Sequence, residues 1–116
     1  MIKFTLPLKL VGANAREHHM VRHRRVKAER KAAGYVLNAL RSQLPVLPIT
    51  VDLTRVSAGT LDQHDNLRMA FKGLVDQVAE TYGLPDCDPA FTWAYHQRAG
   101  KAGEYAAEIS ISSRKA

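Results

Sequence analysis

The stretch LDQHDNLRMAFKGLVDQVAETYGLPDCD (residues 61–88) organises the prediction for the rest of the chain. Apolar side chains recur through it at the spacing of one helix face: Leu67, Phe71, Leu74, Val75, Val78 and Tyr82. Gly83 follows the last of them, and glycine readily takes the left-handed conformation that ends many helices. We therefore expect a helix from Leu67 to Tyr82.

Acidic residues flank this predicted helix on both sides, with Asp62 and Asp65 before it and Asp86 and Asp88 after it. Asp62 or Asp65 could cap the helix, because a short acidic side chain accepts the free N–H groups of the first turn. Capping does not require both residues and does not account for the second cluster. Carboxylates inside a basic protein are typical of Mg²⁺ sites that act on phosphates, since hard oxygen ligands suit this ion.

A polar stripe runs along the same predicted helix, separate from the apolar one. Asp65, Arg68, Lys72 and Asp76 stand at offsets of zero, three, seven and eleven, which places them on a common face. A carboxylate and an ammonium group could thus face one substrate from this helix.

The segment from Ile2 to Val11 alternates apolar and polar residues, as a half-buried strand does, and Pro7 indicates a sheet edge or a bulge. A helix is expected from about His19 to Ser42. Its apolar positions recur at helical spacing, at Val26, Ala33, Leu37, Leu40 and Leu44.

Basic residues crowd the first half of that helix. Before Pro48 the chain has ten Lys and Arg against two Glu, whereas the whole chain has a formal charge of +6, so the remainder carries −2. A basic half beside a mildly acidic half suggests a polyanion that one half holds and the other acts on. A solvated helix face is the alternative interpretation. The residues expected to grip a phosphate backbone are Arg16, Arg22, Arg24, Arg25, Lys27 and Lys31.

Three further strands are expected, at Ile49–Val56, Ala90–Arg98 and Tyr105–Ser112, each with alternating apolar residues. Phe91, Trp93 and Tyr95 share one side of the second of these strands. We expect them to be core residues, although three aromatic rings on one face could also stack nucleobases. The resulting β-α-β-α-β-β order predicts one α+β domain over residues 1–116, a small two-layer α/β sandwich with a mixed four-stranded sheet and two helices.

Composition excludes several classes of protein. The single cysteine, Cys87, rules out an intramolecular disulfide and a multi-cysteine zinc site, which favours a reducing cytoplasm. The first eleven residues are too short and too interrupted for a signal peptide, and no apolar run is long enough to cross a membrane. We expect a cytoplasmic protein without a membrane partner.

The order of elements, with Asp65-Asn66-Leu67 opening the second helix and an acidic turn closing it, resembles the RusA-type Holliday junction resolvases of phages and prophages. The resemblance covers nearly the whole chain. It implies a dimeric, Mg²⁺-dependent endonuclease that resolves branched DNA in recombination and repair, with Mn²⁺ able to substitute. In that family an Asp-x-Asp-Asn-Leu motif and a later Asp-Asp pair bind the metal, and a lysine assists.

Carried over by position, Asp65 matches the second Asp of the motif and Asp86 the second Asp of the pair. Three positions depart from the pattern: Gln63 replaces the first Asp of the motif, Met69 the lysine, and Pro85 the first Asp of the pair.

The resemblance thus implies catalytic roles for Asp62, Asp65, Asp86 and Lys72, with Asp62 standing in from one residue further out and Lys72 from one turn later. The metal ligands would come from Asp62, Asp65, Asp86 and Asp88. A non-catalytic accessory protein for branched or single-stranded DNA remains the alternative, and an RNA-binding regulator is a third possibility.

Overall fold

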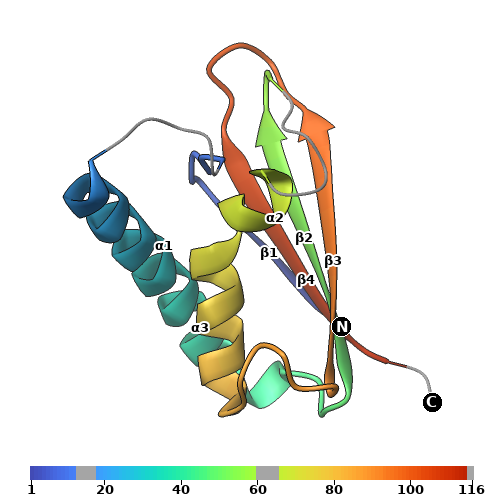
Figure 1. Cartoon of the computed structure of the whole chain (residues 1–116). Coiled ribbons are helices and arrows are strands. Elements are labelled where there is room, and N and C mark those ends of the chain that lie inside the picture. Colours follow the sequence, from blue (N-terminus) through green and yellow to red (C-terminus); the bar gives the residue numbers. More distant parts are fainter. Residues whose placement is uncertain (13–17, 60–65, 115–116) are drawn as a thin grey trace.

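The computed structural model describes residues 1–12, 18–59 and 66–114 of the chain. In these ranges the elements are β1 (Ile2–Leu6), α1 (His19–Ala39), a 3-10 helix η1 (Arg41–Gln43), β2 (Ile49–Ser57), α2 (Asn66–Ala70), α3 (Lys72–Tyr82), β3 (Phe91–Ala99) and β4 (Ala106–Ser113). The α-helices lie on one side of the sheet (Figure 1). The predicted two-layer α+β sandwich is confirmed.

The sheet has the strand order β1-β4-β2-β3. Strand β4 pairs antiparallel with both β1 and β2, whereas β2 and β3 are parallel, so the sheet is mixed, as predicted. Parallel neighbours need a crossover connection, and here α2 and α3 provide it. This crossover places both helices over the parallel strands β2 and β3.

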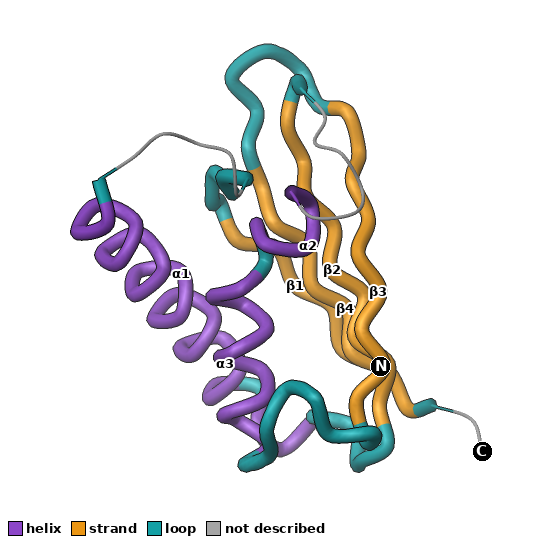
Figure 2. The backbone as a smooth tube through the Cα atoms, viewed as in Figure 1, coloured by secondary structure: helices purple, strands orange, loops and turns teal. Residues whose placement is uncertain are grey.

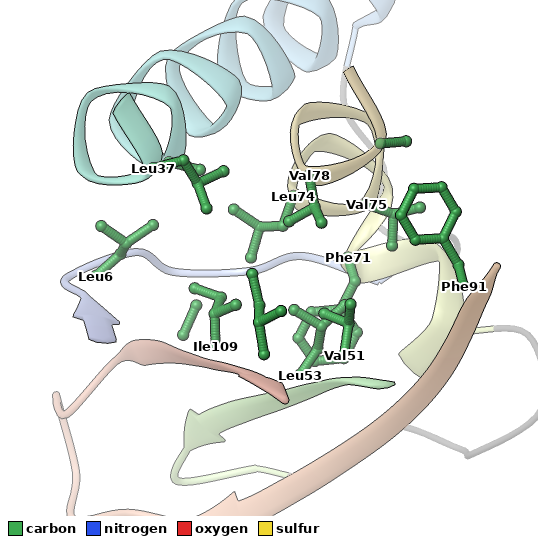
Figure 3. Packing of buried hydrophobic residues seen from close by; sticks show 14 of the residues in the cluster. Leu6, Leu37, Val51, Leu53, Phe71, Leu74, Val75, Val78, Phe91 and Ile109 are labelled. Atoms are coloured by element: carbon green, nitrogen blue, oxygen red, sulfur yellow. The ribbon is translucent and has the colours of Figure 1, made fainter. Parts of the chain in front are cut away.

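The core lies between the helices and the sheet. Figure 3 shows side chains of α1, α3 and the strands meeting in this space, and among the most deeply buried are Leu37, Val51, Leu53, Phe71, Leu74, Val78, Ile109 and Ile111. Alternate residues of β2 and β4 are buried, which follows from the period of two of a strand with one covered face. No helix in the described ranges is long and apolar enough to span a membrane.

The first strand is shorter than predicted and ends at Leu6 rather than Val11. Pro7 has no N–H to donate to a ladder, and the chain turns at this point, where the Leu8 amide donates to the Leu6 carbonyl over 2.8 Å. The following segment still packs inward, with Leu10 only 2% exposed. Buried Arg55 on β2 holds it by donating from Nε to the Leu10 carbonyl, 3.1 Å away.

The predicted helix from Leu67 to Tyr82 is in fact two helices, α2 and α3, which meet at Phe71. Phe71 has φ −93° and ψ 4°, away from helical geometry, and its side chain is fully buried. Its ring stacks on Tyr95 of β3 with centroids 5.7 Å apart. The helix therefore breaks at the residue whose ring is buried against the sheet. Helical periodicity in the sequence cannot reveal this break.

The first helix also ends earlier than predicted, at Ala39 instead of Ser42, and the residues that follow form η1. The other predicted strands are each displaced by one residue at one or both ends, to β2, β3 and β4 as given above. These shifts leave the order and pairing of the elements unchanged.

Candidate functional site

A pocket of about 290 Å³ opens where α2, the start of α3, the loop after α3 and β3 meet. The first two of these segments are separated by the break at Phe71, and the other two are distant from them in the sequence. Its lining residues are Arg68, Met69, Lys72, Val75, Asp76, Asp86 and Tyr95. We call it the central pocket. It brings together two of the predicted catalytic residues, Lys72 and Asp86.

The loop after α3 sets the position of Asp86. Gly83 ends α3 in the left-handed conformation with φ 73°, as predicted, and the Leu84 amide donates back to the Ala79 carbonyl over 3.2 Å. The loop then rises beside α3 before β3 begins (Figure 2). The indole Nε1 of Trp93 donates to the Asp86 backbone carbonyl over 2.8 Å, which ties the loop to β3.

Charges of both signs line the central pocket. Lys72 Nζ lies 3.6 Å from a carboxylate oxygen of Asp76, one turn along α3. Both side chains are partly exposed, so the pair contributes little to stability. Arg68 adds a second cation and Asp86 a second carboxylate. The predicted polar stripe of Arg68, Lys72 and Asp76 therefore reaches one pocket despite the helix break.

Tyr95 brings a hydroxyl group to the same pocket. Burial raises the pKa of Tyr95 above its ordinary value, while the neighbouring Arg68 acts in the opposite direction. The phenol is therefore neutral at physiological pH and can donate a hydrogen bond. Sequence analysis assigned Tyr95 to the core; its ring does pack there against Phe71, and its other end reaches the pocket.

A narrower pocket of about 60 Å³ adjoins the central pocket and shares Met69 and Lys72 with it. It lies along the seam between α1 and α3, and we call it the seam pocket. Its other lining residues are Val11, Gly12, Arg22, Arg25, Val26, Glu29, Ala70 and Gly73. A third pocket, about 300 Å³, shares Asp76 and Asp86 with the central one. Shared lining residues link the three pockets on α3, and we refer to these pockets together as the groove.

The predicted basic surface lies on α1, and two of its residues, Arg22 and Arg25, also line the seam pocket. Arg22, Arg24, Lys27 and Lys31 are exposed there. Arg25 is half-buried and turns toward the seam. Arg22 and Arg25 therefore bring cations to the seam pocket beside Glu29, whereas charges of both signs line the central pocket and the third pocket.

Asp88, which the structure describes, does not line the central pocket. Asp88 has a local role, because its Oδ1 accepts a hydrogen bond from the Ala90 amide, 2.9 Å away. Asp62, Asp65 and Arg16 lie outside the described residues, so convergence of Asp65 with Asp86 stays a prediction. Within the described ranges, no three His, Cys, Asp or Glu side chains form a group that could hold a metal ion.

Sequence reasoning missed Glu29, which is only 2% exposed although it stands in the basic run. Its position could have revealed this, because Glu29 falls at helical spacing between Val26 and Ala33 on the apolar stripe of α1. An acidic residue on an apolar stripe indicates a buried, paired carboxylate.

No family model, no curated protein and no solved structure matches this chain. The candidate site therefore rests on the residues and their geometry.

Proposed function

We propose that this protein is a Mg²⁺-dependent endodeoxyribonuclease that cleaves branched DNA, with four-way junctions as the expected substrate. The observation that carries the proposal is the central pocket, in which Lys72, Arg68 and Asp86 come together from separate segments next to a basic helix. A phosphodiester backbone crossing the seam pocket and the central pocket would meet Arg22 and Arg25 in the first and Asp76 and Asp86 in the second. The resemblance to RusA-type resolvases supports the same chemistry.

Mg²⁺ would be the expected metal, because proteins commonly hold it through one or two carboxylates together with water and substrate phosphate. Asp86 would be one such ligand, and Asp65, with Asp62, would complete the set. Asp76 is the other carboxylate of the pocket. The metal, when bound, supplies an activated water and neutralises charge on the leaving oxygen.

The side chains of the protein itself would bind the DNA and stabilise the charge on the phosphate. Lys72 and Arg68 would neutralise charge that develops on the phosphate, and such preorganised groups are usually a large part of catalysis. The neutral Tyr95 hydroxyl would donate a hydrogen bond to a phosphate oxygen. The exposed cations of α1 would bind DNA arms through their backbones, so that recognition follows junction shape more than sequence. A homodimer, as the family resemblance implies, would present two such grooves.

Two observations favour the alternative, a non-catalytic protein that binds branched or single-stranded DNA. Lys72 is engaged by Asp76, and Met69 lines the pocket where the resemblance would place a lysine. In that function the carboxylates would be structural and the basic helix would still hold DNA.

Synthetic four-way junctions separate the two functions. Wild type, Asp65→Asn and Asp86→Asn are incubated with junction in Mg²⁺ or Mn²⁺, and binding is measured in parallel by gel shift in chelator. We expect wild type to cut and both variants to lose cleavage by about a hundredfold or more while still binding. Asp52→Asn is the matched control, because Asp52 alternates with the buried residues of β2 and pairs with His96 away from the helices. Wild type that binds but never nicks the junction would establish the accessory function.

A further inference from the structure

Glu29 is a buried carboxylate at the seam between α1 and α3. Its side chain is 3% exposed, and Arg25, one turn earlier on α1, donates from Nη1 to its Oε2 over 3.0 Å. Removing a carboxylate from water is costly, and apolar side chains of similar size often give stability equal to or greater than that of a buried ion pair. Stability alone therefore does not explain this pair.

The seam is built to admit the Glu29 side chain. A Cβ placed on Gly73, in the first turn of α3, would lie 3.1 Å from Glu29 Oε1 and 3.2 Å from the Val26 carbonyl oxygen. Only glycine leaves room for this approach without a shift of the neighbours. Glu29 lines the seam pocket together with three cationic side chains, Arg22, Arg25 and Lys72.

The geometry points to a phosphate subsite in the seam pocket. We propose that Arg25 and Lys72 hold a backbone phosphate of the DNA next to the one in the central pocket, and that Glu29 is the positioning residue that fixes the Arg25 guanidinium. The inference rests on the proposed function for the identity of the phosphate. A guanidinium carries five N–H donors in a rigid fork, so it can meet a carboxylate and a phosphate together. Lys72 would link the subsite to the central pocket, whose wall it shares.

The subsite can be tested by the direction in which the affinity for DNA changes when the charge of Glu29 is removed. Glu29→Gln removes a negative charge close to the bound polyanion, and long-range electrostatics alone would then strengthen DNA binding. A positioning role predicts the opposite, because Arg25 loses the charged partner that holds it. The direction of the change in affinity therefore distinguishes the two effects.

Junction binding is measured by fluorescence anisotropy in chelator over a range of salt concentrations. We expect Arg25→Ala to weaken binding about tenfold and to reduce the salt slope by about one. Glu29→Gln should weaken binding about threefold. In the Arg25→Ala background Glu29→Gln should not weaken binding further, because its positioning role passes through Arg25 and only the electrostatic gain remains. Arg25→Lys, which keeps the charge without the fork, should restore only part of the affinity.

Arg41→Ala is the matched control, since Arg41 is exposed on η1 and lines none of the groove pockets described here. Thermal melting of each variant establishes that it is folded. Glu29→Gln that binds as tightly as wild type or tighter, or Arg25→Ala no weaker than Arg41→Ala, would overturn the subsite. The binding pattern is read without metal, so a wild type that binds but does not cut removes the nuclease proposal and leaves the subsite supported. A wild type that binds no DNA removes both.

Discussion

The indole N–H of Trp93 donates a hydrogen bond of 2.8 Å to the backbone carbonyl of Asp86, seven residues earlier in the chain. The ring also packs against Phe91, with centroids 5.2 Å apart. One side chain on β3 thus anchors the loop that carries a carboxylate of the central pocket. Because the bond is made to the backbone of Asp86, its role can be separated from that of the carboxylate itself.

Trp93→Phe keeps an aromatic ring and removes the donor. We expect stability to fall by about 1 kcal/mol or less, because one exposed hydrogen bond is removed. Cleavage of junction DNA should fall further, by about tenfold, because Asp86 is held less firmly. Urea unfolding and single-turnover cleavage measure the two effects. Cleavage that stays at the wild-type rate would show that the loop holds Asp86 without this bond.

Asp86 and Asp88 make a second comparison, since they are two residues apart and only Asp86 lines the central pocket. Asp88→Asn retains an oxygen that can accept from the Ala90 amide, whereas Asp86→Asn removes a charge from the pocket. We expect a loss of cleavage of about a hundredfold for Asp86→Asn and a far smaller one for Asp88→Asn. A larger loss of cleavage for Asp88→Asn would mean that Asp88, rather than Asp86, is the metal ligand.

Gly73→Ala tests the close approach of α3 to Glu29. The added methyl must displace Glu29 or the backbone of Val26, so we expect a destabilisation of about 1–3 kcal/mol despite the better helix propensity of alanine. Gly59→Ala is the matched control, because no atom of the described residues lies within 4 Å of a Cβ at that position. Denaturant unfolding compares the two. Equal stability of both variants would mean that the seam can open without cost.

Tyr82 gives a prediction for alkaline pH. Its hydroxyl donates to the Pro45 carbonyl over 2.7 Å, and burial raises its pKa above the ordinary value of 10.0. This hydrogen bond stabilises the fold only while the Tyr82 phenol is neutral. Its contribution is therefore complete below pH 10 and disappears as the pH rises through the higher pKa of Tyr82 in the folded state. Tyr82→Phe should therefore cost about 1 kcal/mol at pH 8 and progressively less above pH 10. A difference that does not change with pH would contradict this.

The exposed cations of α1 give the last prediction. Replacing Arg24, Lys27 and Lys31 by alanine should weaken junction binding and flatten its dependence on salt. The logarithmic slope should change by about 0.9 for each phosphate that the protein no longer neutralises, because fewer counterions are released. The matched control removes three exposed cations elsewhere, at Lys3, Arg41 and Lys101. Identical salt slopes for the two triple variants would mean that the DNA lies away from α1.

Local patterns in the sequence were sufficient for the fold class, for the order of most elements along the chain and for part of the candidate site, but not for the order of the strands in the sheet. Period-two alternation identified all four strands, and Gly83 identified the end of α3 from its conformational freedom alone. Spacing along one helix predicted that Arg68, Lys72 and Asp76 would face the same way. These features depend on neighbours a few residues apart, which is the range over which sequence periodicity reports directly.

Tertiary contacts decided what the patterns could not. The helix break at Phe71 accompanies a ring that packs on Tyr95, 24 positions later, and helical spacing runs straight through it. The placement of Asp86 depends on Trp93, and the burial of Glu29 depends on Gly73, which belongs to another helix. The sequence by itself therefore determined which residue types were present and on which faces they lay. Only the packing of α3 against both α1 and the sheet decided which of them share a pocket, because that packing joins side chains with no local relation in the chain.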